Sequence, residues 1–142
     1  MAKVLQYKEY QMYINVSDKD SANSFFKNSP ISFRVQIEPP ICLEPDVNWT
    51  CALMECDFRE ELEEQFEDMY IYCNLINTSV VNGKYDNLLR VVNKSRIFSQ
   101  PFFIPISSTV IDQIHFQIRK HDGTKPTDRP ETTRLVLKIE KK

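Results

Sequence analysis

Hydrophobic and polar residues alternate at every second position along three long stretches of the chain. Residues 31–37 place apolar side chains in one phase and polar ones in the other, and Pro39-Pro40 ends the run. Residues 114–119 and 133–140 repeat the pattern. Because successive side chains of a strand point to opposite faces, each stretch is predicted to be a strand with one solvent-facing side.

Shorter segments that are rich in aromatic or β-branched residues lie between Asn, Asp, Ser, Gly or Pro, and these are weaker strand signals. They cover residues 7–16, 49–56, 69–76, 88–93 and 101–107. The two glycines fall in Asn82-Gly83 and Asp122-Gly123, which favour tight turns between strands. The pattern therefore predicts an all-β domain of eight antiparallel strands, a sandwich or a barrel.

One segment follows a different period. Phe58, Leu62, Phe66 and Met69 are spaced by four, four and three residues, which predicts a short helix near residues 58–69. The stretch 55–68 also carries eight acidic residues and one basic residue, the pattern of a solvated loop or helix face.

Size and composition limit the possible functions. The 142 residues suit one domain, 1–142, whose first 29 residues we expect to form a strand and a partly mobile loop. Two glycines are too few for a glycine-rich phosphate loop, and a formal net charge of −2 gives no general attraction to nucleic acid. No run of apolar residues is long enough to span a membrane. We expect neither membrane insertion nor specific nucleic-acid binding.

Residue types that carry out catalysis are sparse. The four cysteines contain no Cys-x-x-Cys pair and lie in or beside apolar runs, which favours buried free thiols. His115 falls on the polar phase of a predicted strand, and His121 adjoins a turn, so both are interpreted as solvated. We expect no catalytic residue, no metal site and no cofactor, and hence no enzyme.

A surplus of aromatic residues indicates an interaction surface instead. The candidate interface lies within eight residues and consists of Phe98, Phe102, Phe103 and Pro105. The same residues could instead belong to the core of a strand, and the sequence favours neither interpretation. The adjacent Phe102 and Phe103 would point to opposite faces of a strand, so only one of them could lie in the core. Phe25, Phe26 and Lys27 are the nearest approach to a nucleic-acid stacking motif, and one such triplet is a weak signal.

The core is predicted from the apolar phase of the strands. Its expected members are Phe33, Val35, Trp49, Leu53, Ile114, Phe116, Leu135 and Leu137.

Several runs resemble a known family in their order and spacing. They are residues 49–55 (WTCALME), 70–76 (YIYCNLI), 88–92 (LLRVV), 103–106 (FIPI), 111–119 (IDQIHFQIR) and the Asp122-Gly123 turn. Together they resemble the penton, or minor capsid, proteins of Polinton/Maverick elements, adintoviruses and virophage-like viruses, over roughly residues 30–140. The step before the last strand, 127–131, and the acidic 55–68 segment depart from that family's pattern.

The resemblance implies a single jelly-roll β-sandwich that forms homopentamers at the fivefold vertices of a capsid. The implied partner is a double jelly-roll major capsid protein, and the implied location is the virion, after synthesis in the host cytoplasm and assembly there or in the nucleus. Two other functions stay open. One is an acidic pentameric chaperone like nucleoplasmin. The other is a carbohydrate-binding sandwich, but Trp49 alternates with Cys51 and Leu53, which predicts a buried ring and argues against an exposed sugar platform.

Overall fold

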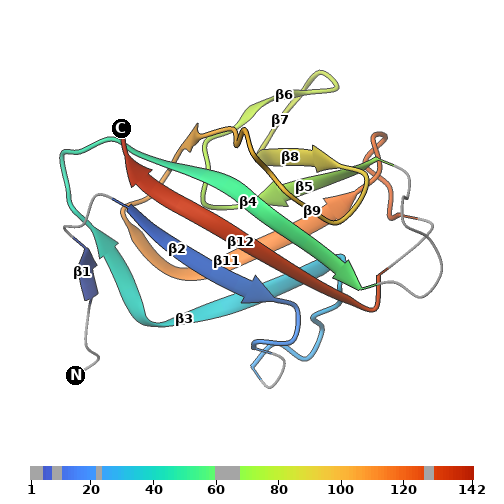
Figure 1. Cartoon of the computed structure of the whole chain (residues 1–142), viewed down its shortest axis with the longest axis horizontal. Coiled ribbons are helices and arrows are strands. Elements are labelled where there is room, and N and C mark those ends of the chain that lie inside the picture. The colour runs from blue at the N-terminus through green and yellow to red at the C-terminus, as the bar shows by residue number, and fades with distance from the viewer. Residues whose placement is uncertain (1–4, 8–10, 22–23, 60–67, 127–129) are drawn as a thin grey trace.

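The computed structural model describes the chain except residues 1–4, 8–10, 22–23, 60–67 and 127–129. The described residues are all-β and contain no helix (Figure 1). The strands are β1 (Leu5–Tyr7), β2 (Gln11–Ser17), β3 (Ser32–Leu43), β4 (Trp49–Arg59), β5 (Met69–Cys73), β6 (Ser79–Val81), β7 (Lys84–Asp86), β8 (Leu88–Val92), β9 (Arg96–Ile97), β10 (Ile104–Pro105), β11 (Val110–Arg119) and β12 (Thr132–Lys141).

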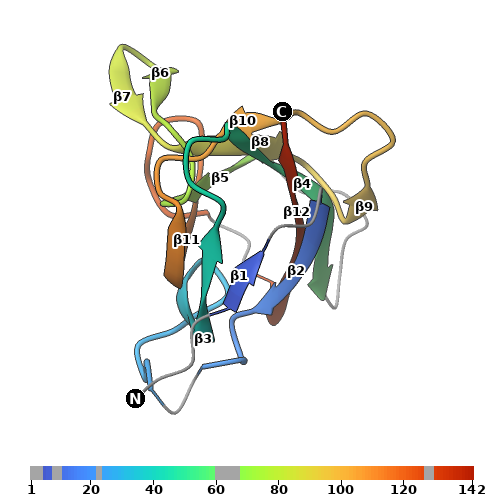
Figure 2. The ribbon, with the colours of Figure 1, turned by 90° about the vertical axis from the view of Figure 1, so that its left-hand side faces the viewer.

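Two sheets account for most of these strands. The first, sheet A, has the order β1-β3-β11-β5-β8, and the second, sheet B, has the order β10-β4-β12-β2, with β9 also paired to β4. All pairs are antiparallel except β1 with β3. The hairpin β6-β7 projects away from both sheets (Figure 2). The sheets therefore consist mainly of pairings between strands that are distant in the sequence.

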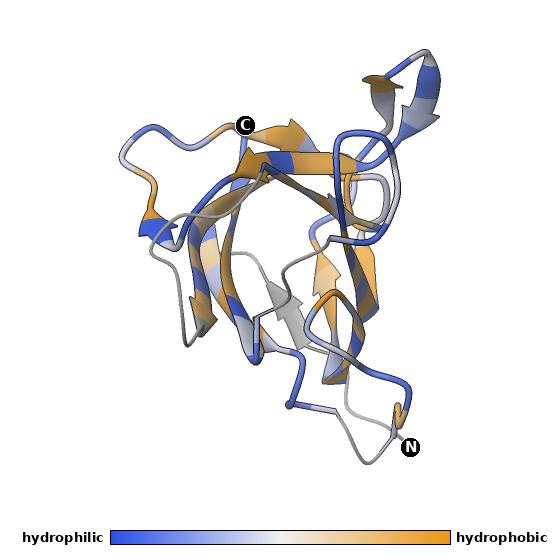
Figure 3. Cartoon of the chain, turned by 90° about the vertical axis from the view of Figure 1, so that its right-hand side faces the viewer, coloured by the Kyte–Doolittle hydropathy of each residue, from blue (hydrophilic) through white to orange (hydrophobic). Residues whose placement is uncertain are grey.

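The sheets lie face to face, and the apolar phase of each strand fills the space between them (Figure 2). Bands of hydrophobic and hydrophilic residues alternate along the strands, as the alternation in the sequence requires (Figure 3). All eight expected core residues are buried: Phe33, Val35, Trp49, Leu53, Ile114, Phe116, Leu135 and Leu137. At its centre the rings of Phe33 and Phe116 lie 5.2 Å apart, one from each of two neighbouring strands.

Pro39-Pro40 does not end a strand, contrary to the prediction from the sequence. Strand β3 continues to Leu43, and its pairing with β11 shifts from Ile41 opposite Ile111 to Gln36 opposite Gln113. The two prolines lie within this irregularity, where the regular ladder of backbone hydrogen bonds does not require the N–H groups that proline lacks.

The N-terminal strand prediction is also corrected. Residues 7–16 were expected to form one strand, whereas β1 belongs to sheet A and β2 to sheet B. The chain thus contributes an edge to each sheet within a few residues.

The helix expected near residues 58–69 is wrong at both of its ends. Phe58 is the buried, inward-facing end of β4, and Met69 begins β5. Leu62 and Phe66 lie outside the described residues. The spacing of four residues matched a helical stripe because two strand residues happened to flank the acidic segment.

Both glycine turns are present. Asn82 and Gly83 have φ values of 51° and 80° and connect β6 to β7, a hairpin whose strands the sequence analysis did not identify. Gly123, at φ 86°, donates its N–H to the carbonyl of Lys120 at 3.0 Å in the turn after β11.

The four cysteines are free. Cys51, Cys56 and Cys73 are buried and Cys42 is half-buried. Burial raises the pKa of Cys56 to about 11 and that of Cys73 to about 12. Burial, followed by the nearby Cys73, also raises the pKa of Cys51. These three thiols stay protonated and serve as small apolar side chains.

Candidate interaction surfaces

Residues 98–105, the aromatic segment, run along the edge of β4 and divide into a buried and an exposed part. Phe98 is only 6 % exposed and belongs to the hydrophobic core, so its prediction as an interface residue is corrected. Its N–H donates to the carbonyl of Met54 at 2.8 Å, which continues the pairing begun by β9 and turns the ring inward.

The other aromatic residues of this segment lie outside the core. Residues 101–103 precede β10 and are not in a strand, so the strand rule for adjacent residues does not apply. Phe102 is 65 % exposed, Phe103 is half-buried and Pro105 is exposed. Phe102, Phe103 and Pro105 therefore remain candidates for an interface. The prediction that one of the two adjacent phenylalanines lies in the core is wrong.

Arg90 of β8 fixes this segment against sheet A. Its guanidinium carbon lies 3.8 Å from the ring centre of Phe98 and 4.6 Å from that of Phe102, and Nη1 donates to the carbonyl of Gln100 at 3.1 Å. Such cation–π contacts stabilise by about 0.5–1 kcal/mol each at exposed sites. Desolvation, followed by the neighbouring Arg96, lowers the pKa of Arg90. The segment thus joins the β4 edge of one sheet to the β8 edge of the other.

Phe103 extends an aromatic surface over the outer face of sheet B. The ammonium nitrogen of Lys138 lies 6.0 Å from the Phe103 ring centre and 5.6 Å from that of Tyr13, and 3.4 Å from the Glu140 carboxylate. Tyr13 of β2 is largely exposed, as is Ile97 of β9, which pairs with the same edge of β4 as β10. Apolar surface with its cation already paired is suited to contact with another protein.

A second surface lies on the outer face of sheet A. Loop residues 24–28 and residues of β3 and β11 enclose an open groove of about 500 Å³, which we name the cationic groove. It is lined by Ser24, Phe25, Phe26, Lys27, Asn28, Ser32, Phe33, Arg34, His115 and Gln117. The sequence groups Phe25, Phe26 and Lys27 as a weak stacking motif, and it carries no local signal for the strands that lie beneath them.

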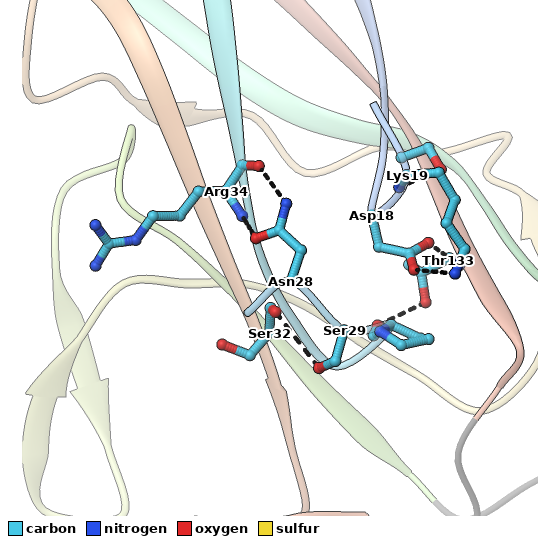
Figure 4. Close-up of polar contacts among 9 residues, drawn as sticks. Asp18, Lys19, Asn28, Ser29, Ser32, Arg34 and Thr133 are labelled. Atoms are coloured by element: carbon cyan, nitrogen blue, oxygen red, sulfur yellow. Dashed lines mark hydrogen bonds and ion pairs between the residues drawn. The ribbon is translucent and has the colours of Figure 1, made fainter. Parts of the chain in front are cut away.

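Hydrogen bonds to main-chain atoms hold the wall of this groove (Figure 4). The Asn28 side chain accepts from the N–H of Arg34 at 2.9 Å and donates to its carbonyl at 2.8 Å. Ser21 Oγ accepts from the N–H of Gln36 at 3.0 Å. These contacts occupy backbone groups on the side of β3 opposite β11 and protect an edge that could otherwise pair with another chain.

A buried polar cluster ties the same loop to sheet B (Figure 4). Thr133 Oγ1 donates to the carbonyl of Pro30 at 2.7 Å, while its N–H donates to the Asp18 carboxylate at 2.9 Å. Asp18 and Thr133 are both buried, and Asp18 also lies 3.7 Å from the Lys19 ammonium. The groove loop is therefore fixed at both sheets.

His115 lies near two cations, Arg34 inside the groove and Arg119 beyond it. Desolvation, then Arg34 and Arg119, lower its pKa. Its own backbone N–H donates to Asn74 Oδ1 at 2.9 Å, so the strand position is fixed whatever the charge of the ring. The arrangement favours anions over cations as neighbours of the imidazole.

Trp49 lies at the other end of the molecule and cannot serve as an exposed sugar platform. It is buried, and its indole N–H donates to the carbonyl of Glu44 at 3.0 Å. Among the described residues, no group of three or more His, Cys, Asp or Glu side chains could hold a metal ion. The same part of the chain contains no helix long and apolar enough to cross a membrane.

No protein-family model matches this chain, and no curated protein matches it.

Proposed function

We propose that the chain is a structural capsid protein, a penton or minor capsid protein that forms homopentamers at fivefold vertices. In this role it contacts a double jelly-roll major capsid protein and needs no catalytic site. The proposal rests on the family resemblance of its sequence and on the order of its strands.

The strand order is the observation that carries the proposal. One sheet reads β3-β11-β5-β8 apart from the short β1, and the other reads β2-β12-β4 followed by β9 and β10 on one edge. If β9 and β10 count as one interrupted strand, because both pair with the same edge of β4, eight strand positions result. We infer from this order a jelly roll of two four-stranded sheets, an architecture that viral capsid proteins share with lectins and cupins.

The surface supplies the second support, because the fold alone does not distinguish a capsid protein from other jelly rolls. Phe102 and Pro105 are exposed on the aromatic segment, and Phe103 joins them to the aromatic surface of sheet B. A stable ring needs about 1,200–2,000 Å² of buried area per contact, with a few aromatic anchors that dominate the energy. Phe102 is the leading candidate for such an anchor.

Substitution at Phe102 tests the proposal. Phe102→Asp should shift sedimentation from pentamer to monomer, because it places a charge in a desolvated contact, while the circular dichroism stays the same. Tyr85→Asp in the projecting hairpin is the matched control, since Tyr85 is also largely exposed, and it should leave the pentamer intact.

Co-expression with a double jelly-roll capsid protein provides the second arm. Co-purification that depends on the intact pentamer supports the vertex function. A pentamer that does not bind the capsid protein but binds basic proteins would favour the chaperone alternative and contradict the proposal.

A further inference from the structure

The described residues that line the cationic groove include cations and no acidic side chain. Lys27 and Arg34 contribute permanent charges, His115 lies between them and β5, and none of the ten lining residues is Asp or Glu. The next cation along β11, Arg119, is already committed, because it pairs with Asp86 at 3.3 Å and stacks 4.8 Å above Tyr72. Lys27 and Arg34 therefore give the groove a local excess of positive charge.

The groove also presents apolar surface. Phe26 is 85 % exposed at its rim, and Phe25 beside it is half-buried. When an apolar side chain of a partner covers an exposed aromatic ring, apolar surface leaves the water and the free energy of binding becomes more favourable. Ser24, Ser32 and Gln117 add groups that hydrogen-bond to a polypeptide backbone.

The groove is preformed in the chain without a partner. The two Asn28 hydrogen bonds and the Ser21 hydrogen bond attach its loop to β3, and the Thr133–Pro30 hydrogen bond attaches it to β12. A prearranged wall reduces the entropy lost on binding.

We propose that the cationic groove binds an acidic polypeptide segment that carries an aromatic or aliphatic side chain. Its carboxylates pair with Lys27 and Arg34, and its apolar side chain covers Phe26. Single-stranded nucleic acid fits less well, because it needs a track of cations along many phosphates, whereas this groove has two permanent charges on a chain of net charge −2.

The chain itself contains a sequence of the required chemistry, which supplies the probe. The peptide EELEEQFED, the sequence of residues 60–68, has six acidic residues together with Leu62 and Phe66. A fluorescent copy of this peptide, titrated with the full chain, should show saturable binding that weakens with salt, since screening reduces the attraction between exposed charges. A second peptide with serine at both apolar positions should bind more weakly.

Two substitutions locate the binding site. Arg34→Glu and Phe26→Ser should each weaken binding by about tenfold or more. Both should fold, because Asn28 holds the main chain of Arg34 and not its side chain, and Phe26 is exposed. Lys84→Glu makes the same change of charge on the projecting hairpin and should leave binding unchanged.

His115 supplies a readout that a nonspecific charge effect would not move. Carboxylates bound between Arg34 and His115 should raise the pKa of His115, measured by NMR titration with and without peptide. The proposal is overturned if the peptide does not bind at about 1 mM, if Lys84→Glu weakens binding as much as Arg34→Glu, or if oligo(dT) binds more tightly than the peptide.

Discussion

The two sheets are alike on their inner faces and differ on their outer ones. On sheet B, cations have acidic partners: Arg134 lies 2.9 Å from Glu55, Lys138 pairs with Glu140, and Lys141 pairs with Glu44. On sheet A, Arg119 has Asp86, while Arg34 has no ion pair with any described residue, and the exposed acids Glu38 and Asp112 lie farther along β3 and β11. The cations of these three pairs on sheet B are balanced locally, whereas Arg34 on sheet A is not paired with an acid among the described residues.

This difference indicates different partners for the two faces. A neutral face with exposed aromatic residues can meet a second copy of itself or another protein without repulsion. A local excess of cations, as at the groove on sheet A, attracts anionic groups. We therefore propose that self-assembly would use sheet B and the aromatic segment, and that an acidic partner would bind to sheet A.

The largest expected effect separates the inner faces from the outer ones. Phe116→Ala should lower the free energy of unfolding by about 3–5 kcal/mol, because it empties the centre of the core beside Phe33. Gln117→Ala, one residue along the same strand but outward, should change it by less than about 0.5 kcal/mol. Urea unfolding measures both, and equal effects would contradict the assignment of faces.

The second effect concerns the connection between the sheets. Asp18→Ala removes the acceptor of the buried Thr133 N–H and should cost about 1–3 kcal/mol of stability. Asp18→Asn keeps one oxygen as an acceptor and should cost less. Calorimetry tests both variants, and an Asp18→Ala variant as stable as the unmodified protein would refute the role of this cluster.

The smallest effect is the pH response of sheet A. Desolvation and then Arg34 and Arg119 lower the pKa of His115 in the folded protein, so the unfolded chain binds the proton more readily. The free energy of unfolding is therefore highest, as far as His115 is concerned, above the unfolded histidine pKa of about 6.5, and it decreases as pH falls from there through the lower pKa of the folded state. His115→Gln should lose less stability between neutral and mildly acidic pH than the unmodified protein, and an identical pH profile would contradict the assignment.

The sequence predicted the inner faces well because alternation is a local property. The phase that contains Phe33, Phe116 and Leu135 is buried as expected. The same phase rule placed Arg34 and His115 outward. It did not reveal that they share a groove, because β3 and β11 meet through a pairing of residues about eighty positions apart in the sequence.

Composition was a weaker guide to the aromatic residues. The cluster of phenylalanines indicated an interface but not which rings it would include, and Phe98 became buried when its N–H paired with Met54. The role of Arg90 between Phe98 and Phe102 depends on the meeting of two sheet edges, for which the chain carries no local signal.

Solution mass tests the central claim most directly. Light scattering from the unmodified protein should give five times the 16.8 kDa of one chain, and the value should persist on dilution to low micromolar concentration. A mass of one chain at high micromolar concentration, or a stable dimer or trimer, would contradict the pentameric vertex protein that we propose.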